Sequence, residues 1–476
     1  MPFRPSSSTN TMKVLPPVLP APSADKIGEI CRKIHNAGGK AYLVGGCVRD
    51  MLLGMEVYEW DLEVFSIGGD DLEKLFPDAL DFVGKCYGIY RFKNLPIDLG
   101  LPRDERPTGA KHREFSVAVD PAMSIVDAAL RRDFTVNAIY WDPLENVIVD
   151  PFAGVGDLEK GVLRHVSERF SEDPLRVLRA MQFVGRFSFS VDEKTVELCR
   201  ALDGQHLSGE RIGGEFNKLI LLGKAIGAGL EFLRSCSWLR FFPELAALVD
   251  CKQDATFHPE GSVWEHVKLA MDVFASRRPL EKFDALAIGL TVLCHDFGKP
   301  ATYVLCEDGR MRAHGHGEAG VPLAKNFLGR MRVANELVET ILPLIDAHML
   351  PRGFSNPKVA TVGAVRRLAW KVKRIDLLLA VARCDNLGRA LPSYDLSGED
   401  RLEEMARAEG VLHSPPEPIL RGRDLLAAFE LEQSPFVGVI LGKLFEMQLD
   451  GHLSSREEAL AAAELLIKKM SASHSS

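Results

Sequence analysis

The stretch LVGGCVRDMLLGMEVYEWDLE, residues 43–63, carries the strongest indication of the fold of this chain. An apolar run ends at Gly45 and Gly46, a helix-like segment follows, and carboxylates then alternate at Glu59, Asp61 and Glu63. Alternate side chains of a strand share one face, so the three acids would form a site for divalent cations. Glycines lack Cβ, so their backbone N–H groups can approach a phosphate closely. Together these features indicate a two-metal phosphoryl-transfer site, although the acidic alternation alone is also typical of an amphipathic edge strand.

The composition is that of an ordinary soluble protein with several domains. The chain has 476 residues, of which 46% are hydrophobic and 26% charged, and it contains no apolar run that predicts a membrane span. Its nine cysteines form no CxxC pair, which argues against a disulfide framework or a zinc ribbon and favours a reducing cytoplasm. Because the net charge is −8, a nucleic acid would need a local basic patch. VRRLAWKVKR, residues 365–374, is the best candidate, with a solvated helix face as the alternative.

A second motif, RRDFTVNAIYWDP, follows at residues 131–143. Arg132 is a candidate for a bidentate contact with a triphosphate, and Asn137 for a contact with the sugar. Together with LVGGCVRDMLLG, this block resembles the head domain of the tRNA nucleotidyltransferase and bacterial poly(A) polymerase family, which is class II of the polymerase-beta superfamily. The resemblance implies a head that binds Mg²⁺ through Glu59 and Asp61. It also implies nucleotide contacts from Gly45, Gly46, Arg49, Arg132, Asp133 and Asn137.

The metal strand departs from the family pattern, because Glu59 stands where the family has the first aspartate of a D-x-D pair. Glutamate carries its carboxylate one methylene further out, and Mg²⁺ demands near-octahedral geometry. Three alternatives stay open: the site works with Glu59, Glu63 assists, or activity is reduced. Residues 83–103 predict two strands around a turn at Asn94. By the resemblance Asp98, on the second strand, is the third carboxylate and the base for the attacking hydroxyl. A solvent-facing aspartate is the alternative.

Two further segments complete the expected nucleotide site. DERPTGAKHRE, residues 104–114, is polar and predicts a mobile loop. SEDPLRVLRAMQFVGRFSF, residues 171–189, predicts a helix with Ser171 as N-cap. Asp173, Arg176 and Arg179 recur every three residues and would share one helix face, suited to reading the edge of a base, as the family's EDxxR motif does. A salt-bridge ladder is the alternative. Gln182 stands where the family often has an arginine, so it would contact the nucleotide without a charge.

A separate site is expected downstream, where six of the 13 histidines fall between residues 258 and 348. His295 and Asp296 follow an apolar helical run, which indicates a buried metal centre. The pattern H…HD…D resembles the HD phosphohydrolase superfamily. The resemblance implies a divalent transition metal or Mg²⁺ held by His266, His295, Asp296 and Asp385, with His314, His316 and His348 as candidates for a second metal or a substrate phosphate. An inherited HD fold without turnover is the alternative.

We therefore expect an α/β nucleotidyltransferase head, a small mixed sheet with helices, followed by all-α neck, HD and tail domains. The expected boundaries are 1–25 for a disordered tail, 26–165 for the head, 166–250 for the neck, 251–395 for the HD domain and 396–476 for the C-terminal tail. The resemblance implies addition of CMP and AMP from CTP and ATP to the tRNA 3′ end, in the cytoplasm, with a second phosphohydrolase activity. A poly(A) polymerase, a partial A- or CC-adding enzyme, or an HD phosphohydrolase with an RNA-binding head are the alternatives. The oligomeric state stays open.

Overall fold

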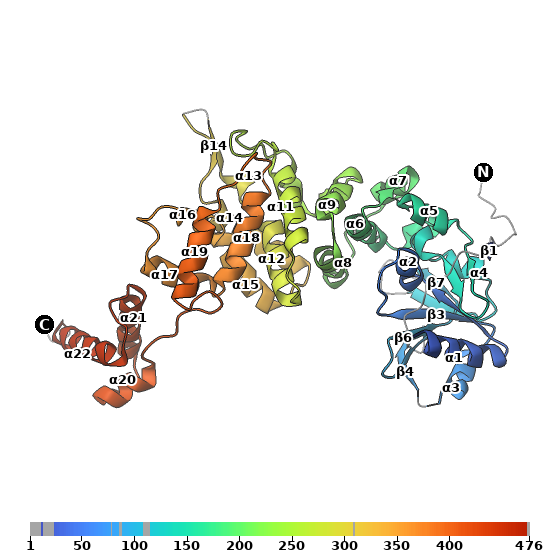
Figure 1. Cartoon of the computed structure of the whole chain (residues 1–476), viewed down its shortest axis with the longest axis horizontal. Helices are drawn as coiled ribbons and strands as arrows, with labels where there is room; N and C mark the ends of the chain where they lie inside the picture. Colours follow the sequence, from blue (N-terminus) through green and yellow to red (C-terminus); the bar gives the residue numbers. More distant parts are fainter. Residues whose placement is uncertain are drawn as a thin grey trace. The chain divides into compact units, whose positions relative to one another are not determined.

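The structure is a computed structural model that describes residues 11–12, 23–77, 79–84, 88–107, 115–307 and 310–473. The chain divides into two compact units (Figure 1). Unit 1 is Met1–Leu219 with Ala228–Phe241, and unit 2 is Ile220–Gly227 with Phe242–Ser476. This arrangement confirms the expected α/β head followed by a largely helical region. The finer division into head, neck, HD domain and tail stays a prediction.

Unit 1 is built on an eight-stranded mixed sheet with the order β1-β10-β9-β2-β3-β6-β5-β4. Its neighbouring strands are antiparallel except β3 and β6, which are parallel. The strands are β1 (Thr11–Met12), β2 (Lys40–Val44), β3 (Trp60–Phe65), β4 (Leu80–Gly84), β5 (Ile89–Phe92), β6 (Ile97–Gly100), β9 (Tyr140–Asp142) and β10 (Val147–Val149). Three two-stranded sheets also occur in the described residues: β7 (Arg103–Pro107) with β8 (Phe115–Val119), β11 (Val162–Leu163) with β12 (Ser190–Val191), and β13 (Tyr303–Leu305) with β14 (Met311–Ala313).

Local sequence explains why these elements form. The first helix buries Ile27, Ile30 and Ile34, which recur at three- and four-residue spacing and so lie on one face. The expected hairpin is confirmed, because β5 and β6 pair antiparallel around Asn94, whose φ is 59°. The helices that begin in unit 1 are α1 (Ser23–Asn36), α2 (Gly46–Leu52), α3 (Gly69–Leu75), α4 (Ile125–Ala129), α5 (Gly154–Lys160), α6 (Leu175–Phe187), α7 (Glu193–Ala201) and α8 (Gly209–Leu222). Helix α9 (Ile226–Ser235) begins in unit 2 and continues in unit 1.

Three local expectations need correction. The tail was expected to be disordered through residue 25, but Thr11–Met12 pair with β10 and α1 begins at Ser23; residues 1–10 and 13–22 lie outside the described residues. The expected loop at 104–114 begins inside strand β7, which pairs with β8, while residues 108–114 also lie outside the described residues. Ser171 does not cap α6, because it lies in a 3-10 turn and the helix begins only at Leu175.

Unit 2 is a helical assembly centred on α12, in which every residue from Ala285 to Cys294 is buried. Because α12 is apolar on all sides, α11, α15 and α18 can all pack against it. The helices are α10 (Pro243–Val249), α11 (Val263–Arg277), α12 (Lys282–Cys294), α13 (Lys299–Thr302), α14 (His316–Arg330), α15 (Asn335–Ala347), α16 (Leu350–Gly353), α17 (Val362–Val372), α18 (Ile375–Leu387), α19 (Ser397–Ala408), α20 (Gly422–Phe429), α21 (Pro435–Leu449) and α22 (Arg456–Ser473). The last three helices enclose a hydrophobic cluster of their own.

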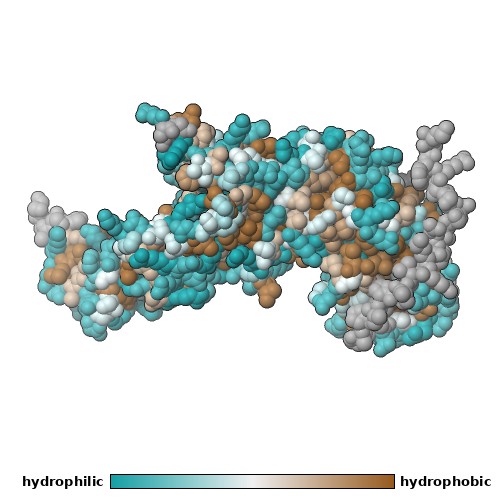
Figure 2. All heavy atoms as spheres, turned by 45° about the horizontal axis from the view of Figure 1, so that its top comes forward, coloured by the Kyte–Doolittle hydropathy of each residue, from teal (hydrophilic) through white to brown (hydrophobic). Residues whose placement is uncertain are grey.

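The surface bears on two further expectations. Figure 2 shows hydrophilic residues spread over the visible face, interrupted by separate hydrophobic patches. Among the described residues, no helix combines the length and apolarity needed to cross a membrane. The basic segment 365–374 is engaged with acids of its own unit: Arg366 pairs with Glu409, and Arg374 with Asp284 and Asp376. These ion pairs favour the alternative of a solvated helix face over an RNA contact.

Candidate functional site

The glycine turn at the start of α2 lies against an arginine of the second motif. Gly45 has φ 74°, a conformation that residues with a Cβ rarely adopt. A Cβ at this position would also lie 3.2 Å from Nη1 of Arg132. Glycine is therefore required here both by the backbone and by the close approach of the guanidinium. The structure thus brings together the two elements from which a phosphate site was expected.

The carboxylates meet because β3 and β6 run parallel. Asp61 and Asp98 are register partners across these strands, so their side chains lie on the same face. Asp61 is exposed while its neighbours Trp60 and Leu62 are buried, and Glu59 is an exposed residue directly before the strand. Although Asp61 is exposed, the protein around its carboxyl group removes part of its hydration and raises its pKa. The charges of Asp98 and Glu59 raise this pKa further, whereas Arg132 opposes the shift. A cluster of hard oxygen ligands with mutual repulsion suits Mg²⁺.

Glu63 does not assist this site, which removes one of the three alternatives for the metal strand. Its buried carboxylate accepts hydrogen bonds from Nη2 of Arg131 at 2.6 Å and Nη2 of Arg132 at 2.9 Å. The hydroxyl of Tyr140 donates a third, at 3.0 Å. Burial alone would raise the pKa of Glu63, but the two arginines lower it below its usual range. The role of Glu63 is to hold both guanidinium groups in place.

Asp98 is held by a residue that the sequence did not single out. Arg91 donates from Nε to Oδ1 and from Nη2 to Oδ2 of Asp98, both at 2.7 Å. Arg91 is the register partner of Asp98 on β5. Asp98 therefore lies where a third carboxylate was expected, with both of its oxygens already paired.

A buried network links the second motif to α6. Asp133 accepts hydrogen bonds from Nδ2 of Asn137 at 2.9 Å and from Nε of Arg179 at 2.7 Å. Burial alone would raise its pKa, but Arg179 and these hydrogen bonds lower it to about 2. Asn137 in turn accepts from Nη1 of Arg49 at 2.7 Å, and the Arg49 guanidinium lies 4.9 Å from the ring centre of Phe183. These contacts favour positioning roles for Arg49, Asp133, Asn137 and Arg179 over direct contact with a nucleotide.

The expected base-reading face is not a single helical ladder. Asp173 precedes α6 and accepts from the backbone N–H of Leu175 at 3.1 Å and from Nη2 of Arg211 at 2.6 Å. Arg176 donates to the carbonyls of Arg169 at 2.7 Å and Arg131 at 2.5 Å. Asp173 and Arg176 are thus each fixed in orientation, and both are partly accessible. This geometry opposes the alternative of an Asp173–Arg176–Arg179 salt-bridge ladder.

Gln182 is an exception among the expected nucleotide contacts. Its side chain is buried, and its Nε2 atom has no hydrogen-bond partner within the described residues. A buried amide donor without a partner costs about 1–3 kcal/mol. The burial of Gln182 does not support the direct contact that the sequence predicted.

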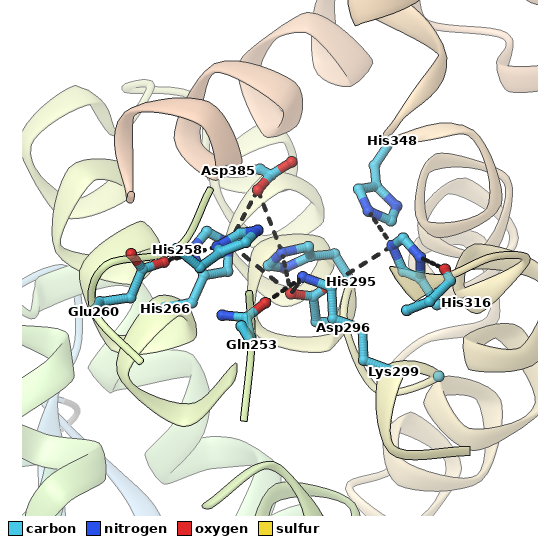
Figure 3. Close-up of polar contacts among 12 residues, drawn as sticks. Gln253, His258, Glu260, His266, His295, Asp296, Lys299, His316, His348 and Asp385 are labelled. Atoms are coloured by element: carbon cyan, nitrogen blue, oxygen red, sulfur yellow. Dashed lines mark hydrogen bonds and ion pairs between the residues drawn. The ribbon is translucent and has the colours of Figure 1, made fainter. Parts of the chain in front are cut away.

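Four of the expected HD ligands converge in unit 2 (Figure 3). His266 comes from α11, His295 and Asp296 follow α12, and Asp385 lies on α18. Nε2 of His266 lies 3.0 Å from Oδ1 of Asp385, and Nε2 of His295 lies 3.2 Å from Oδ2 of Asp296. All four residues are buried. Burial alone would raise the pKa of Asp296, but His295 and Lys299 hold it well below its usual range.

Two of the three additional histidines join this cluster. His316 lies 3.5 Å from Asp296 and 3.1 Å from His348, measured from Nε2 of His316. Nδ1 of each lies 2.7 Å from a backbone carbonyl, of Ala313 and Ile345 respectively, which leaves each Nε2 facing the cluster. Burial lowers the pKa of His348 to about 3. His314 is exposed and lies outside the cluster, so its position does not support the role that the sequence predicted.

The unsatisfied atoms of this cluster fit a metal centre. Among the described residues, Nε2 of His295 and both carboxylate oxygens of Asp296 are buried without a hydrogen bond of normal geometry, although Oδ2 of Asp296 lies 2.7 Å from Nζ of Lys299. The ligand atoms of His266, His295 and Asp296, and those of Asp296, His316 and His348, each lie within 4.8 Å of one another. Asp296 belongs to both groups, which would let it bridge two ions. Nitrogen and oxygen ligands of this kind suit divalent transition metals.

Sequence reasoning missed Glu260, which supports the cluster from behind. Its Oε1 lies 3.0 Å from Nδ1 of His266 and 2.9 Å from Nδ1 of His258, while Oε2 accepts from the backbone N–H of Ala390. A carboxylate on the outer nitrogen of a metal-binding histidine fixes its tautomer. Hydrogen bonds to Asp385 and Glu260 outweigh burial and raise the pKa of His266 to about 9. The spacing HPE…H was the available signal, because it places an acid six residues before His266.

Comparison with known proteins gives a consistent result. Residues 41–164 match the family described as the poly A polymerase head domain. The chain is 33% identical over 361 residues to the multifunctional CCA protein of Tolumonas auensis, covering 73% of this chain and 84% of that protein. Its fold is similar to that of the Bacillus stearothermophilus CCA-adding enzyme in complex with CTP (TM-score 0.65, 20% identity, 96% of this chain and 100% of that one). It is also similar to the Thermotoga maritima CCA-adding enzyme complexed with tRNA (TM-score 0.56, 18% identity, 95% and 96%).

Proposed function

This chain belongs to the family of the multifunctional CCA proteins, and we propose that it adds CMP and AMP, taken from CTP and ATP, to the 3′ end of tRNA. The observation that carries this proposal is that Asp61 on β3 and Asp98 on β6 are register partners within the matched head domain. Strand β3 follows the Gly45 turn and helix α2 in the chain. The names of its relatives favour CCA addition over poly(A) synthesis or partial addition. We place the reaction in the cytoplasm.

The residues of the head divide the work of nucleotidyl transfer. Glu59 and Asp61 would hold Mg²⁺, which when bound neutralises the triphosphate and lowers the pKa of the attacking hydroxyl. Arg132, braced by Glu63, binds oxygens of the triphosphate. Asp98 accepts the proton of the tRNA 3′-hydroxyl. The 3′ oxygen forms a bond to the α-phosphorus, the bond from that phosphorus to the β-phosphate oxygen breaks, and pyrophosphate leaves.

Base selection belongs to the segment at the start of α6. Asp173 and Arg176 are fixed by Arg211 and by two backbone carbonyls, and remain partly accessible. A rigid acceptor and a rigid donor at one place can discriminate cytosine from adenine by their Watson–Crick edges without a template. The nucleotides CTP and ATP and the tRNA end would therefore meet between this segment and the Asp61 strand of the same unit.

The test supplies tRNAs that end at the discriminator base, at C and at CC, each with labelled CTP or ATP alone, followed by sequencing of the products. We expect CTP alone to add two C to the tRNA that ends at the discriminator base and one C to the tRNA that ends at C. ATP alone should add one A to the tRNA that ends at CC, and Asp61→Ala should add no nucleotide. Asp81→Asn, which changes an exposed acid elsewhere on the sheet, serves as the matched control. Near-normal incorporation by Asp61→Ala would refute the metal assignment. Runs of A on any RNA would establish poly(A) polymerase activity instead.

A second activity is favoured by the buried His–Asp cluster of unit 2. We propose metal-dependent hydrolysis of a phosphomonoester or a 2′,3′-cyclic phosphate, which would repair a blocked tRNA end. One divalent ion would be held by His266, His295, Asp296 and Asp385. A second ion would be held by His316, His348 and Asp296, so that Asp296 would be a ligand of both ions. A bound ion would supply a hydroxide nucleophile at neutral pH. Lys299, whose Nζ lies 2.7 Å from Asp296, neutralises charge beside it.

This proposal is tested by His295→Ala combined with Asp296→Ala. We expect the double variant to lose hydrolysis of both substrate types and to keep nucleotide addition, while Asp61→Ala shows the reverse. Metal analysis of the purified protein gives an independent measurement. Absence of Mn, Ni, Co and Mg, together with no hydrolysis when each is added, would make the cluster an inert remnant.

A further inference from the structure

Three charged side chains lie in a row across the head sheet. Arg91 on β5 is the register partner of Asp98 on β6, and Asp98 is the register partner of Asp61 on β3. Register partners point to the same face of a sheet, so the guanidinium and the two carboxylates are neighbours. Glu59 adds a third carboxylate at the end of β3. The row therefore carries three negative charges and one resident positive charge.

Arg91 donates hydrogen bonds to Asp98, the carboxylate that acts as the base in the proposed reaction. Its two bonds to Asp98, each 2.7 Å long, engage both carboxylate oxygens in a fork. Hydrogen bonding to Asp98 raises the pKa of Arg91, and the charges of Glu59 and Asp61 raise it further. Arg91 thus forms its ion pair with Asp98 and also lies in the field of Glu59 and Asp61.

A divalent cation at Glu59 and Asp61 would repel the Arg91 guanidinium, which is paired with the neighbouring Asp98. The side chain of Arg91 is 53% exposed, compared with 28% for Asp98. Arg91 can therefore rotate into solvent at low cost, since an exposed ion pair contributes little to stability. Asp98, fixed in the middle of the strand row, stays in place.

We propose that Arg91 is the resident counter-ion of the catalytic carboxylates and competes with a divalent cation at Glu59 and Asp61 for the negative charge of this cluster. It holds Asp98 in a fixed orientation in the absence of metal, and it must leave Asp98 when a divalent cation binds. Arg91 thereby sets the cation concentration at which the head becomes active. This inference rests on the proposed function, because it takes Asp98 as the third carboxylate.

The competing explanation is that Arg91 only ties β5 to β6, as many cross-strand ion pairs do. The two explanations predict opposite changes in cation affinity when Arg91 is replaced. Loss of a competitor tightens cation binding, whereas loss of a contact between β5 and β6 disturbs the site and weakens cation binding. Arg91→Leu removes the charge and keeps an apolar stem, and Arg91→Lys keeps the charge without the fork. Lys93→Leu removes an exposed charge next to β5 and is the matched control.

The experiment measures cation binding at the head by local backbone cleavage. Fe²⁺ is titrated into the full-length protein with ascorbate and peroxide, and fragments cut near Asp61 and Asp98 are quantified by mass spectrometry. Cleavage near Asp296 in the same sample reports the HD cluster and serves as an internal reference. Mg²⁺ competition of the cleavage, and the Mg²⁺ dependence of CMP incorporation, are measured on the same variants.

For Arg91→Leu we expect half-saturation of cleavage near Asp61 at about two- to fivefold lower Fe²⁺, which corresponds to an exposed ion pair. Cleavage near Asp296 should not change, Arg91→Lys should shift less, and Lys93→Leu should resemble the wild type. The half-saturating Mg²⁺ for incorporation should fall in parallel. Unchanged or weaker binding in Arg91→Leu, or an equal shift in Lys93→Leu, would overturn the inference and leave the proposed function standing. Absence of cleavage near Asp61 in every variant would overturn both.

Discussion

The charge on Asp133 is expected to hold α6 against the head, and its removal gives a quantitative test of the buried network. Asp133→Asn keeps the shape of the side chain but places an amide opposite the Arg179 guanidinium, which donates to Asp133 at 2.7 Å. The pKa of Asp133 falls from 3.8 to about 2 in the folded protein. A shift of about 1.8 units at 1.36 kcal/mol per unit is worth about 2.4 kcal/mol.

The sign of the pH dependence follows from this lowered pKa. Above the unfolded value of 3.8 the carboxylate is charged in both states, so the full stabilisation is present. As pH falls toward about 2, the unfolded state takes up a proton first and the stabilisation is lost. We therefore expect Asp133→Asn to be less stable by about 2–3 kcal/mol at pH 7. The difference should shrink to roughly half near pH 3.

Hydrogen exchange measured by mass spectrometry reads this effect locally. Peptides covering residues 134–140 and 175–187 should exchange faster in Asp133→Asn, whereas peptides of α12 in unit 2 should not change. Asp81→Asn, at an exposed acid of the same sheet, controls for loss of charge. Equal protection in variant and wild type at pH 7 would contradict the role of the network. A difference that stays constant from pH 7 to pH 3 would show that the Asp133 charge is not its cause.

Three further outcomes are expected. Glu59→Asp shortens the carboxylate to the family's usual length, so CMP incorporation should be retained or rise; a drop of more than about tenfold would show that the site is built around glutamate. Arg176→Ala leaves two carbonyls without their donor, at about 1–3 kcal/mol each, and should reduce the discrimination between CTP and ATP in kcat/KM more than it weakens tRNA binding. Unchanged discrimination would restrict Arg176 to a structural role. Glu260→Gln should weaken metal binding by the His266 cluster about 10–100-fold in equilibrium dialysis, with nucleotide addition as the unaffected control; unaltered metal affinity would rule out a supporting role.

The expectations that succeeded were those set by local periodicity. The turn at Asn94 follows from two strands that flank a polar break. The HD pair was predictable because an apolar helix delivers His295 and Asp296 to its buried end. Each of these features depends on residues that lie close together in the sequence, so the local pattern is sufficient to predict it.

The partners of charged side chains required the tertiary structure. The alternation at Glu59, Asp61 and Glu63 suggested three equivalent acids, but only the fold brings Arg131 and Arg132 against Glu63 and so separates it from Glu59 and Asp61 in role. Likewise, a side chain on β5 determines that both oxygens of Asp98 are paired. Nothing in the local pattern distinguishes such acids from one another.

By itself the sequence determined the class of fold, the glycine turn, the acidic strand and the cluster of histidines and aspartates as a candidate site. Only the tertiary structure decided that parallel strands place Asp98 beside Asp61, and that His316 and His348 share Asp296 while His314 does not. The physical reason is range. Strand and helix periodicity is fixed by bonded geometry between near neighbours, whereas an ion pair or a metal cluster depends on which distant segments pack together and on what they remove from water.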